Sequence, residues 1–337
     1  MNILILGGTR FIGVPVVWQL QAAGHRVAVF TRGRSAAPLP DGVLRLTGDI
    51  AALDEARDAF AAFAPDVILH NVILTAEHAA TLMRVGKGLA RRVVMLSSLD
   101  VYRAYGRLHG SEPGPIELLP LTEDSPLREQ RYPYRATAPA PDHPFYNYDK
   151  IPAEQIVLGD PDLPGTVLRL PMVIGPRDYQ RRLLPFLRPM LDGRPAIVMA
   201  ASYAAWRSTY GYVDNVAAAI ALACTDERAA GRVYNVADAS PTIHELAGLV
   251  AEAVGWTGRL VIRPDETLPP ALRPEANLSQ HLVASAARIT AELGYRPAVP
   301  LVEAVRRTVA WERDNPPDSL PEGLLHYEAE DEVLRGL

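Results

Sequence analysis

Tyr146 and Lys150 lie four positions apart, and their side chains could share acid–base chemistry. Of the 34 basic residues in the chain, 32 are arginine, so a lysine at this position stands out. Positions four apart lie on one face of a helix, and we predict a helix over residues 146–158. A neighbouring ammonium favours the ionised form of a phenol, whose ordinary pKa is about 10. The two side chains could therefore bind the same ligand, and the alternative is that the spacing arises by chance, since the chain has 13 tyrosines.

A glycine-rich turn, residues 7–13, follows the first apolar run and precedes an amphipathic stretch. In this setting, backbone N–H groups and the dipole of the following helix can hold a pyrophosphate. Gly8 or its predecessor would make the tight turn, and the last glycine would let the helix pack closely on the strand. We expect a dinucleotide to bind at Gly7, Thr9, Arg10, Phe11, Ile12 and Gly13.

The end of the second predicted strand indicates which dinucleotide is favoured. An acidic residue there would bind the ribose diol of NAD, whereas an arginine suits the 2′-phosphate of NADP. The chain has Arg32 and Arg34 at this point and no acid, and Arg10 adds a third guanidinium nearby. Because arginine pairs with phosphate through charge-assisted hydrogen bonds, NADP is favoured over NAD. The alternative is that these arginines are simply solvated.

Short apolar runs alternate with helical patterns in the first half of the chain. The runs are continuously apolar, which is typical of strands buried on both faces of a parallel sheet. We therefore predict an α/β fold with a doubly wound parallel (Rossmann) sheet and a ligand at the carboxyl ends of its strands. Predicted strands are 2–6, 26–31, 43–46, 66–70 and 93–97, and predicted helices are 12–23, 51–63 and 76–91.

Residues 103–144 interrupt this alternation with a segment rich in Pro, Gly and charge. Long irregular loops in compact domains are usually functional, and we interpret this one as an inserted lid on the substrate side. We predict a Rossmann domain over 1–170 that contains the inserted loop. A smaller C-terminal α/β substrate lobe follows over 171–337, with residues near 208–240 returning to the first domain.

Composition excludes several classes of function. The net charge of −5, without a basic tract, argues against nucleic acid or anionic membrane as a partner. The eight histidines show no metal-ligand spacing, so we expect no metal. The single Cys224 excludes an intramolecular disulfide. With no signal peptide or membrane-spanning run expected, we predict a cytoplasmic protein.

Five further motifs follow in a fixed order, and together they are more specific than any one of them. With the glycine turn and the Tyr146/Lys150 segment, the chain resembles the extended short-chain dehydrogenase/reductase family, also called the NAD-dependent epimerase/dehydratase family. The turn itself resembles that of an atypical subgroup with chloroplast RNA-binding members. The motifs span residues 97–102, 168–177, 212–217, 234–236 and 293–297.

The resemblance implies a role for each matching residue. It implies that Ser98 binds the reacting oxygen, that Tyr146 is the general acid or base, and that Lys150 supports it and holds the nicotinamide ribose. It places Asp49 and Ile50 at the adenine. It implies further cofactor contacts from Asn71, Val72, Ser97, Pro171 and Val173, and substrate contacts from Asp100, Arg177 and Arg207.

Three departures from the family pattern bear on the substrate. Arg10 stands where the family fingerprint has glycine. Leu99 replaces the first of two acids found in many 4,6-dehydratases, which weakens dehydration and leaves Asp100. The Gly-Asp-Gly loop that often precedes the substrate arginine is replaced by Ala and Ser residues at 200–202, which puts the nucleotide end of a nucleotide sugar in doubt.

Several functions remain open from the sequence. The first is an NAD(P)-dependent epimerase or reductase acting at a hydroxyl or ketone carbon, on a nucleotide sugar or related carbohydrate. An alternative is an NADPH-dependent ketone reductase of a non-nucleotide small molecule. A non-catalytic dinucleotide-binding or RNA-binding protein is the remaining class. By analogy with relatives that pair the helices near 76–91 and 146–158, we expect a homodimer.

Overall fold

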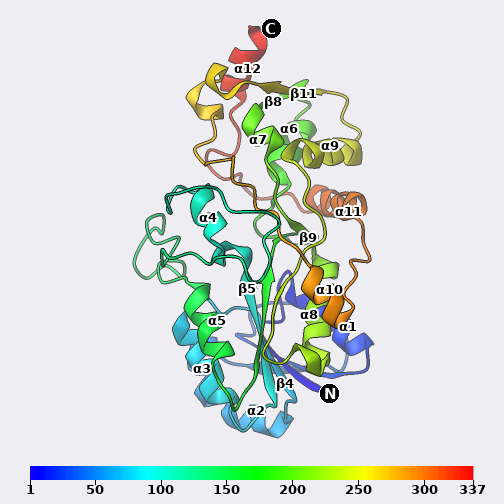
Figure 1. Ribbon diagram of the computed structural model, residues 1–337. Helices are drawn as coiled ribbons and strands as arrows, with labels where there is room; N and C mark the ends of the chain where they lie inside the picture. Colours follow the sequence, from blue (N-terminus) through cyan, green and yellow to red (C-terminus); the bar gives the residue numbers. More distant parts are fainter. Residues whose placement is uncertain (337) are drawn as a thin grey trace.

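Seven parallel strands form the central sheet of the computed structural model, which describes residues 1–336. Their order is β10-β6-β5-β4-β1-β2-β3, and every neighbouring pair is parallel. Figure 1 labels β4 and β5 of this sheet. The apolar side chains of β1 alternate between the two faces, so both faces must be covered. The strands are β1 (Asn2–Leu6), β2 (Arg26–Thr31), β3 (Leu44–Thr47), β4 (Val67–His70), β5 (Arg92–Ser98), β6 (Gly165–Leu170) and β10 (Val233–Asn235).

Helices cover the two faces and give each its own core. Ile3 and Ile5 pack in one core with residues of α1 (Gly13–Ala22) and α8 (Val213–Thr225). Leu4 and Leu6 pack in the other with α2 (Arg57–Phe63), α3 (Ala76–Gly86) and α5 (Lys150–Leu158). Figure 1 shows these two layers on opposite sides of the sheet. The predicted doubly wound fold is confirmed.

A smaller group of elements lies beyond the carboxyl ends of the strands (Figure 1). In it β8 pairs with β11, and β7 pairs with β9. Its strands are β7 (Met172–Ile174), β8 (Ala196–Ala200), β9 (Tyr210–Tyr212) and β11 (Arg259–Arg263). Its helices are α6 (Leu184–Leu191), α7 (Ala201–Ala205), α9 (Ile243–Val254), α11 (Leu301–Asp314) and α12 (Tyr327–Arg335). Residue 337, the last of the predicted lobe, lies outside the described residues.

The remaining helices are short. Of these, α10 (Ala287–Leu293) packs beside β10 (Figure 1). The 3₁₀ helix η1 (Ile50–Ala56) has a kink at Ala52. Single turns of 3₁₀ helix are η2 (Leu99–Val101), η3 (Glu227–Ala229), η4 (Asp265–Thr267) and η5 (Pro270–Leu272).

The predicted helix over 146–158 is wrong at its beginning, because α5 begins only at Lys150. Asp149 is the N-cap, in an extended conformation, and its carboxylate accepts a hydrogen bond from the Ile151 N–H at 3.2 Å. The same carboxylate pairs with Arg131 of the inserted segment at 2.8 Å. Because these contacts hold Asp149 outside the helix, Tyr146 lies in a turn and does not share a helix face with Lys150.

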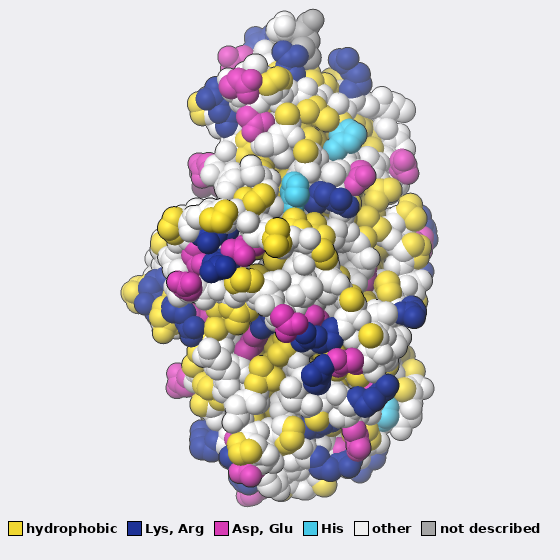
Figure 2. Space-filling model, viewed as in Figure 1, with side chains coloured by type: hydrophobic (Ala, Val, Ile, Leu, Met, Phe, Trp, Pro, Cys, Tyr) yellow, Lys and Arg dark blue, Asp and Glu magenta, His cyan; other side chains and the backbone are white. Residues whose placement is uncertain are grey.

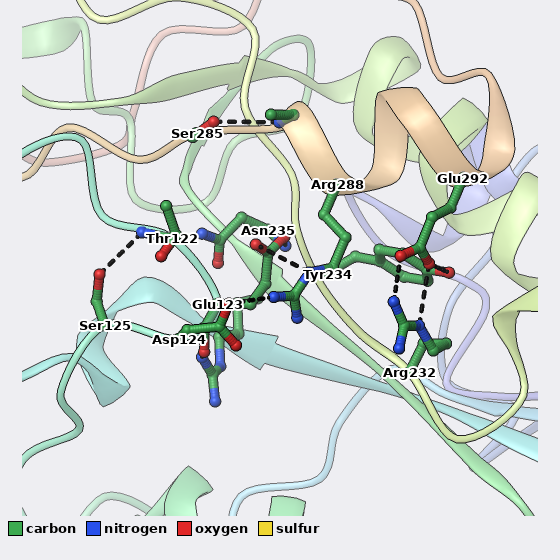
Figure 3. Close-up of polar contacts among 12 residues, drawn as sticks. Thr122, Glu123, Asp124, Ser125, Arg232, Tyr234, Asn235, Ser285, Arg288 and Glu292 are labelled. Atoms are coloured by element: carbon green, nitrogen blue, oxygen red, sulfur yellow. Dashed lines mark hydrogen bonds and ion pairs between the residues drawn. The ribbon is translucent and has the colours of Figure 1, made fainter.

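The segment predicted as an inserted loop, 103–144, also differs from the prediction, since its first six residues form helix α4 (Arg103–Leu108). The rest is irregular but tied down at several points. Glu123 accepts a hydrogen bond from the backbone N–H of Asn235 in β10 at 2.8 Å, and Arg288 of α10 pairs with Glu123 and Asp124 (Figure 3). The insertion is therefore anchored to the edge of the central sheet.

The described residues were compared with what a nucleic-acid-binding, membrane-spanning or metal-binding protein would need. Figure 2 shows basic and acidic side chains interspersed over the visible face. Within residues 1–336, no helix has the length and apolarity needed to cross a bilayer. Over the same residues, no group of three or more potential metal ligands is found.

Candidate active site

The turns that carry the predicted cofactor residues all leave the same edge of the sheet. Because the strands are parallel, their carboxyl ends lie side by side. The chain runs from β1 to one edge through β2 and β3, and to the other through β4, β5 and β6. The order of the strands therefore reverses between β1 and β4, which is where open α/β sheets bind ligands.

The glycine turn after β1 has a geometry that other residues could not adopt. Gly7 has a φ of +88°, and a Cβ on it would lie 2.5 Å from Val72. A Cβ on Gly13 would lie 2.7 Å from the backbone of Gly8. Helix α1 begins without a side-chain cap and without an acid in its first turn. This turn, with its uncapped helix N-terminus, fits the pyrophosphate of a dinucleotide.

Around the turn, the other residues expected at the dinucleotide lie at different depths. Arg10 is exposed, Thr9 and Ile12 are half-buried, and Phe11 is buried with its ring edge-on to Tyr179. Arg32, after β2, is exposed in a turn that Gly33 makes with a φ of +70°.

Asp49 and Ile50 follow β3 at the same edge. Asp49 is exposed and caps η1, and Ile50 is half-buried against the core beneath β3. Arg32 and Asp49 thus follow β2 and β3, whose carboxyl ends lie side by side.

The residues after β4 and β6 form the opposite wall. The Asn71 side chain donates to the Gly7 carbonyl at 3.1 Å, and its own oxygen is buried with no partner within residues 1–336. Val72 is 39% exposed. Pro171 and Val173, after β6, are buried. An unpaired buried amide oxygen beside the glycine turn is what a donor on a bound cofactor would satisfy.

Ser97 and Ser98 end β5 but face different surroundings. The Ser97 hydroxyl donates to Glu154 of α5, inside the protein. The Ser98 hydroxyl accepts from the backbone N–H of Asp100 at 3.2 Å and is half-buried at the sheet edge. Ser97 therefore has a structural bond inside the protein, whereas Ser98 lies half-buried at the edge of the sheet.

Lys150 is buried at the start of α5. Its ammonium donates to the carbonyls of Ile73 and of Leu96, the latter at 3.1 Å. Burial lowers the pKa of Lys150 to about 8, and the nearby carboxylates of Asp100 and Glu154 act in the opposite direction. The Lys150 ammonium therefore lies beside the last residues of β5, and it loses its proton at a pH just above neutral.

Tyr146 lies apart from Lys150. Its backbone N–H bonds to the His143 carbonyl at 2.9 Å, and its ring lies under the guanidinium of Arg135 at 4.9 Å. Arg135 also donates to the Tyr146 carbonyl at 3.2 Å. Lys150 is thus bonded to β5, the strand that ends in Ser98, whereas these contacts of Tyr146 are with Arg135 and His143.

Two tyrosines without a predicted role occupy the space beside Ser98. Tyr148 is buried, and its hydroxyl donates to Asp100 at 2.8 Å. Tyr134 of the insertion donates to the same oxygen of Asp100 at 2.9 Å. The only indication in the sequence is that aromatic residues are frequent in the insertion and in the segment before Lys150.

The two arginines expected at the substrate are both exposed. Arg177 is exposed, with a φ of +71°. Arg207 is exposed and donates to the Ser240 carbonyl at 3.0 Å. Its side chain lines a surface hollow of about 580 Å³ together with Glu245 and Glu252. That hollow carries carboxylates, which disfavour a diphosphate there.

A second hollow, of about 510 Å³, lies between α6, β8 and the segment before α12. Its lining is mostly apolar, with few charged groups. Among these, Arg273 is already bonded to the Leu268 and Glu266 carbonyls. The apolar lining includes Phe186, Ile197, Met199, Tyr203, Leu272 and Leu278.

The doubly wound sheet with a glycine turn at its switch point is typical of a dinucleotide-binding fold of the Rossmann class. Comparison with models of known families identifies the family to which the chain belongs. The model of the NAD dependent epimerase/dehydratase family matches residues 3–237, and the chain belongs to this family. The resemblance seen in the sequence is thereby confirmed.

Individual relatives show how far the similarity extends. The chain is 29% identical over 249 residues to 2′-dehydrokanamycin reductase of Streptomyces kanamyceticus. The aligned part is 72% of this chain and 63% of that protein. The chain is also 26% identical over 329 residues to 3-diazoavenalumate denitrifying reductase of a Streptomyces species. That alignment covers 89% of this chain and 97% of the relative. The chain thus spans less than two thirds of the first of these relatives.

Among solved structures, dTDP-glucose 4,6-dehydratase of Bacillus anthracis in complex with NAD superposes with a TM-score of 0.68. The two sequences are 19% identical over 94% of this chain and 97% of that one. At this identity the likeness shows the fold alone.

Proposed function

We propose that this protein is a nicotinamide-dependent oxidoreductase that interconverts a ketone and a hydroxyl on a small polyhydroxylated molecule. The observation that carries the proposal is the placement of Ser98 and the buried Lys150 beside β5, at the same sheet edge as the glycine turn. NAD or NADP would be held by that turn, with Asn71 at its side.

When bound, the nicotinamide supplies or accepts the hydride. Ser98 would donate a hydrogen bond to the oxygen of the reacting carbon. The Tyr146 hydroxyl would give that oxygen its proton during reduction, and the Lys150 ammonium would stabilise the resulting phenolate. Ser98 thus orients the oxygen, and Tyr146 and Lys150 provide its proton.

This assignment requires a local rearrangement. Residues 146–149 would have to add one turn to α5, because only then does Tyr146 lie on the same face as Lys150. In that geometry Tyr148 would turn to another face of the helix and leave Asp100. The two tyrosines would therefore occupy the site in alternative conformations.

Reduction of a non-nucleotide ketone is favoured over epimerisation of a nucleotide sugar. The Arg207 side chain lies among carboxylates, and α7 occupies the place of the Gly-Asp-Gly loop. The similarity to a reductase of 2′-dehydrokanamycin points in the same direction. Nucleotide-sugar epimerisation is the alternative, and such an enzyme would retain its cofactor through a transient ketone.

The experiment that tests this proposal combines cofactor release with one substitution. Denaturation of the purified protein should release little nicotinamide if the enzyme is a reductase, and a stoichiometric amount if it is an epimerase. Tyr146→Phe should lower turnover of a ketone substrate by a factor of about 10² to 10⁴ without weakening cofactor binding. Loss of turnover in Tyr148→Phe but not in Tyr146→Phe would transfer the role to Tyr148. A protein that neither releases nor binds a nicotinamide would contradict the proposal.

We propose NADP as the preferred cofactor, because exposed arginines and no acid follow β2. Arg32→Ala should raise the KM for NADPH by about 10- to 100-fold and leave the KM for NADH nearly unchanged. Arg26→Ala, at the opposite end of the same strand, is the matched control. Equal effects on both cofactors would contradict the preference.

A further inference from the structure

Tyr179 is an exposed aromatic residue that the smaller group of elements places beside the glycine turn. It lies on the segment 175–183 between β7 and α6, and 73% of its surface is exposed. Its ring meets the ring of Phe11 edge-to-face, with centroids 6.4 Å apart and planes at 87°. Phe11 belongs to the glycine turn, so Tyr179 lies next to the candidate site of the cofactor pyrophosphate.

The backbone on both sides of Tyr179 is fixed by the buried carboxylate of Asp178. Its Oδ1 accepts the Gln180 N–H at 3.1 Å, and its Oδ2 accepts the Arg182 N–H at 3.1 Å. The Arg182 guanidinium pairs with the same carboxylate at 2.9 Å and donates to the Val173 carbonyl at 2.9 Å. The charge of Asp178 is thereby compensated, and Tyr179 is held at the tip of a tight turn.

Arg181 fastens this turn to helix α11. Its guanidinium pairs with the buried carboxylate of Glu312 and donates to the Asn315 carbonyl at 2.9 Å. It also lies over the ring of Trp311, at 5.5 Å from the centroid. Tyr179 is therefore presented to the glycine turn by a segment that is bonded to the smaller group of elements.

The two residues that flank the turn have left-handed backbone conformations. Arg177 has a φ of +71° and Arg181 a φ of +47°. For residues other than glycine this conformation is unfavourable, and it is found where a segment is held in a functional shape. The exposed position of Tyr179 is thus maintained against a conformational cost.

The Tyr179 hydroxyl has a proton to donate. Its oxygen accepts a hydrogen bond from the Gln180 side-chain amide at 3.3 Å, and within residues 1–336 it donates to no acceptor. A phenol hydroxyl can accept and donate at the same time. The first turn of α1 beside it contains no acid. A phosphate oxygen at this place would therefore find a donor and no uncompensated carboxylate in these segments.

We propose that the Tyr179 hydroxyl donates a hydrogen bond to the pyrophosphate of the bound nicotinamide cofactor. The inference rests on the proposed function and adds a cofactor-binding residue from outside the Rossmann sheet. The cofactor is then bound by both groups of elements, and its release requires the hydrogen bond from Tyr179 to break.

Dissociation constants for two ligands, measured by calorimetry, test this inference. The first is NADPH or NADH, whichever the unmodified protein binds more tightly, and the second is the matching fragment without nicotinamide, 2′-phospho-ADP-ribose or ADP-ribose. Tyr179→Phe keeps the ring beside Phe11 and removes the hydroxyl. It should weaken the binding of both ligands by about tenfold, because both contain the pyrophosphate and a hydrogen bond to a charged group is lost.

Tyr132→Phe, which removes the hydroxyl of another exposed tyrosine, is the control and should leave both dissociation constants unchanged. Unchanged binding of both ligands in Tyr179→Phe would overturn the inference, and so would an equal weakening in the control. Weakening of the dinucleotide alone would also overturn it, since the contact would then lie at the nicotinamide. Failure of the proposed function differs from these outcomes, because the unmodified protein would then bind neither NADPH nor NADH.

Discussion

At the scale of single residues, burial decides what Lys150 can do. The side chain is held between the carbonyls of Ile73 and Leu96, and burial lowers its pKa to about 8. The ammonium form is the one that stabilises a phenolate, and it is lost as the pH rises through this value. The rate of an enzyme that needs this ammonium must therefore depend on pH just above neutrality.

We predict that kcat falls with an apparent pKa of about 8 as the pH rises, and that it does not fall from this cause below pH 7. A pH–rate profile between pH 6 and 10 measures this. In Lys150→Arg the guanidinium stays charged, so the alkaline fall should disappear while the rate drops overall. An identical alkaline fall in this variant would show that another group titrates.

At the scale of elements, a buried ion pair joins α5 to β6. Glu154 and Arg169 are 2% and 4% exposed, and their closest atoms are 2.7 Å apart. Arg169 also donates to the Tyr102 hydroxyl at 2.9 Å, and Ser97 of β5 donates to Glu154. Helix α5 is thereby fixed to two strands, and the position of Lys150 at its start depends on this.

Removal of one partner should leave the other charge buried and unpaired. Glu154→Ala is expected to lower the free energy of unfolding by about 3–5 kcal/mol, measured by urea denaturation. Gln155→Ala, on the exposed side of the same helix, is the control and should change it by less than about 0.5 kcal/mol. A small effect of Glu154→Ala would mean that solvent reaches Arg169.

Predictions of elements succeeded where the signal is local. The continuous apolar runs of β1, β2 and β4 lie within short stretches of sequence. The beginning of α5 was predicted wrongly, because Asp149 is held by Arg131 and by the Tyr132 N–H from the insertion. No local pattern contains those contacts.

At the scale of the whole molecule, the insertion links the two groups of elements. It is bound to the sheet edge through Glu123 and Asn235 (Figure 3). It is also bound to the segment after η5, where the Glu117 N–H donates to the Gln280 side chain at 2.6 Å. The stretch of the insertion from Glu117 to Glu123 is thus bonded to both groups of elements.

We predict a homodimer that pairs α3 and α5 with their copies. The outer face of these helices exposes Glu77, Ala80 and Gln155. Light scattering should give twice the chain mass of 36.7 kDa. In Ala80→Arg the measured mass should fall to that of one chain, because a guanidinium would be placed in the close contact between the helices. Val302→Arg on α11, a 53% exposed site on another face, is the control. A monomer in the unmodified protein would contradict the prediction.

The sequence by itself determined the doubly wound sheet and the glycine turn, because both depend on hydrophobic periodicity and backbone freedom within a few consecutive residues. It also indicated Ser98 and Lys150, whose positions follow from the strand and helix that carry them. Only the tertiary structure decided which tyrosine lies at the site. Tyr134 and Tyr148 reach Asp100 from 34 and 48 residues away. Such contacts depend on the path of the insertion, which is fixed by ion pairs and hydrogen bonds between distant segments.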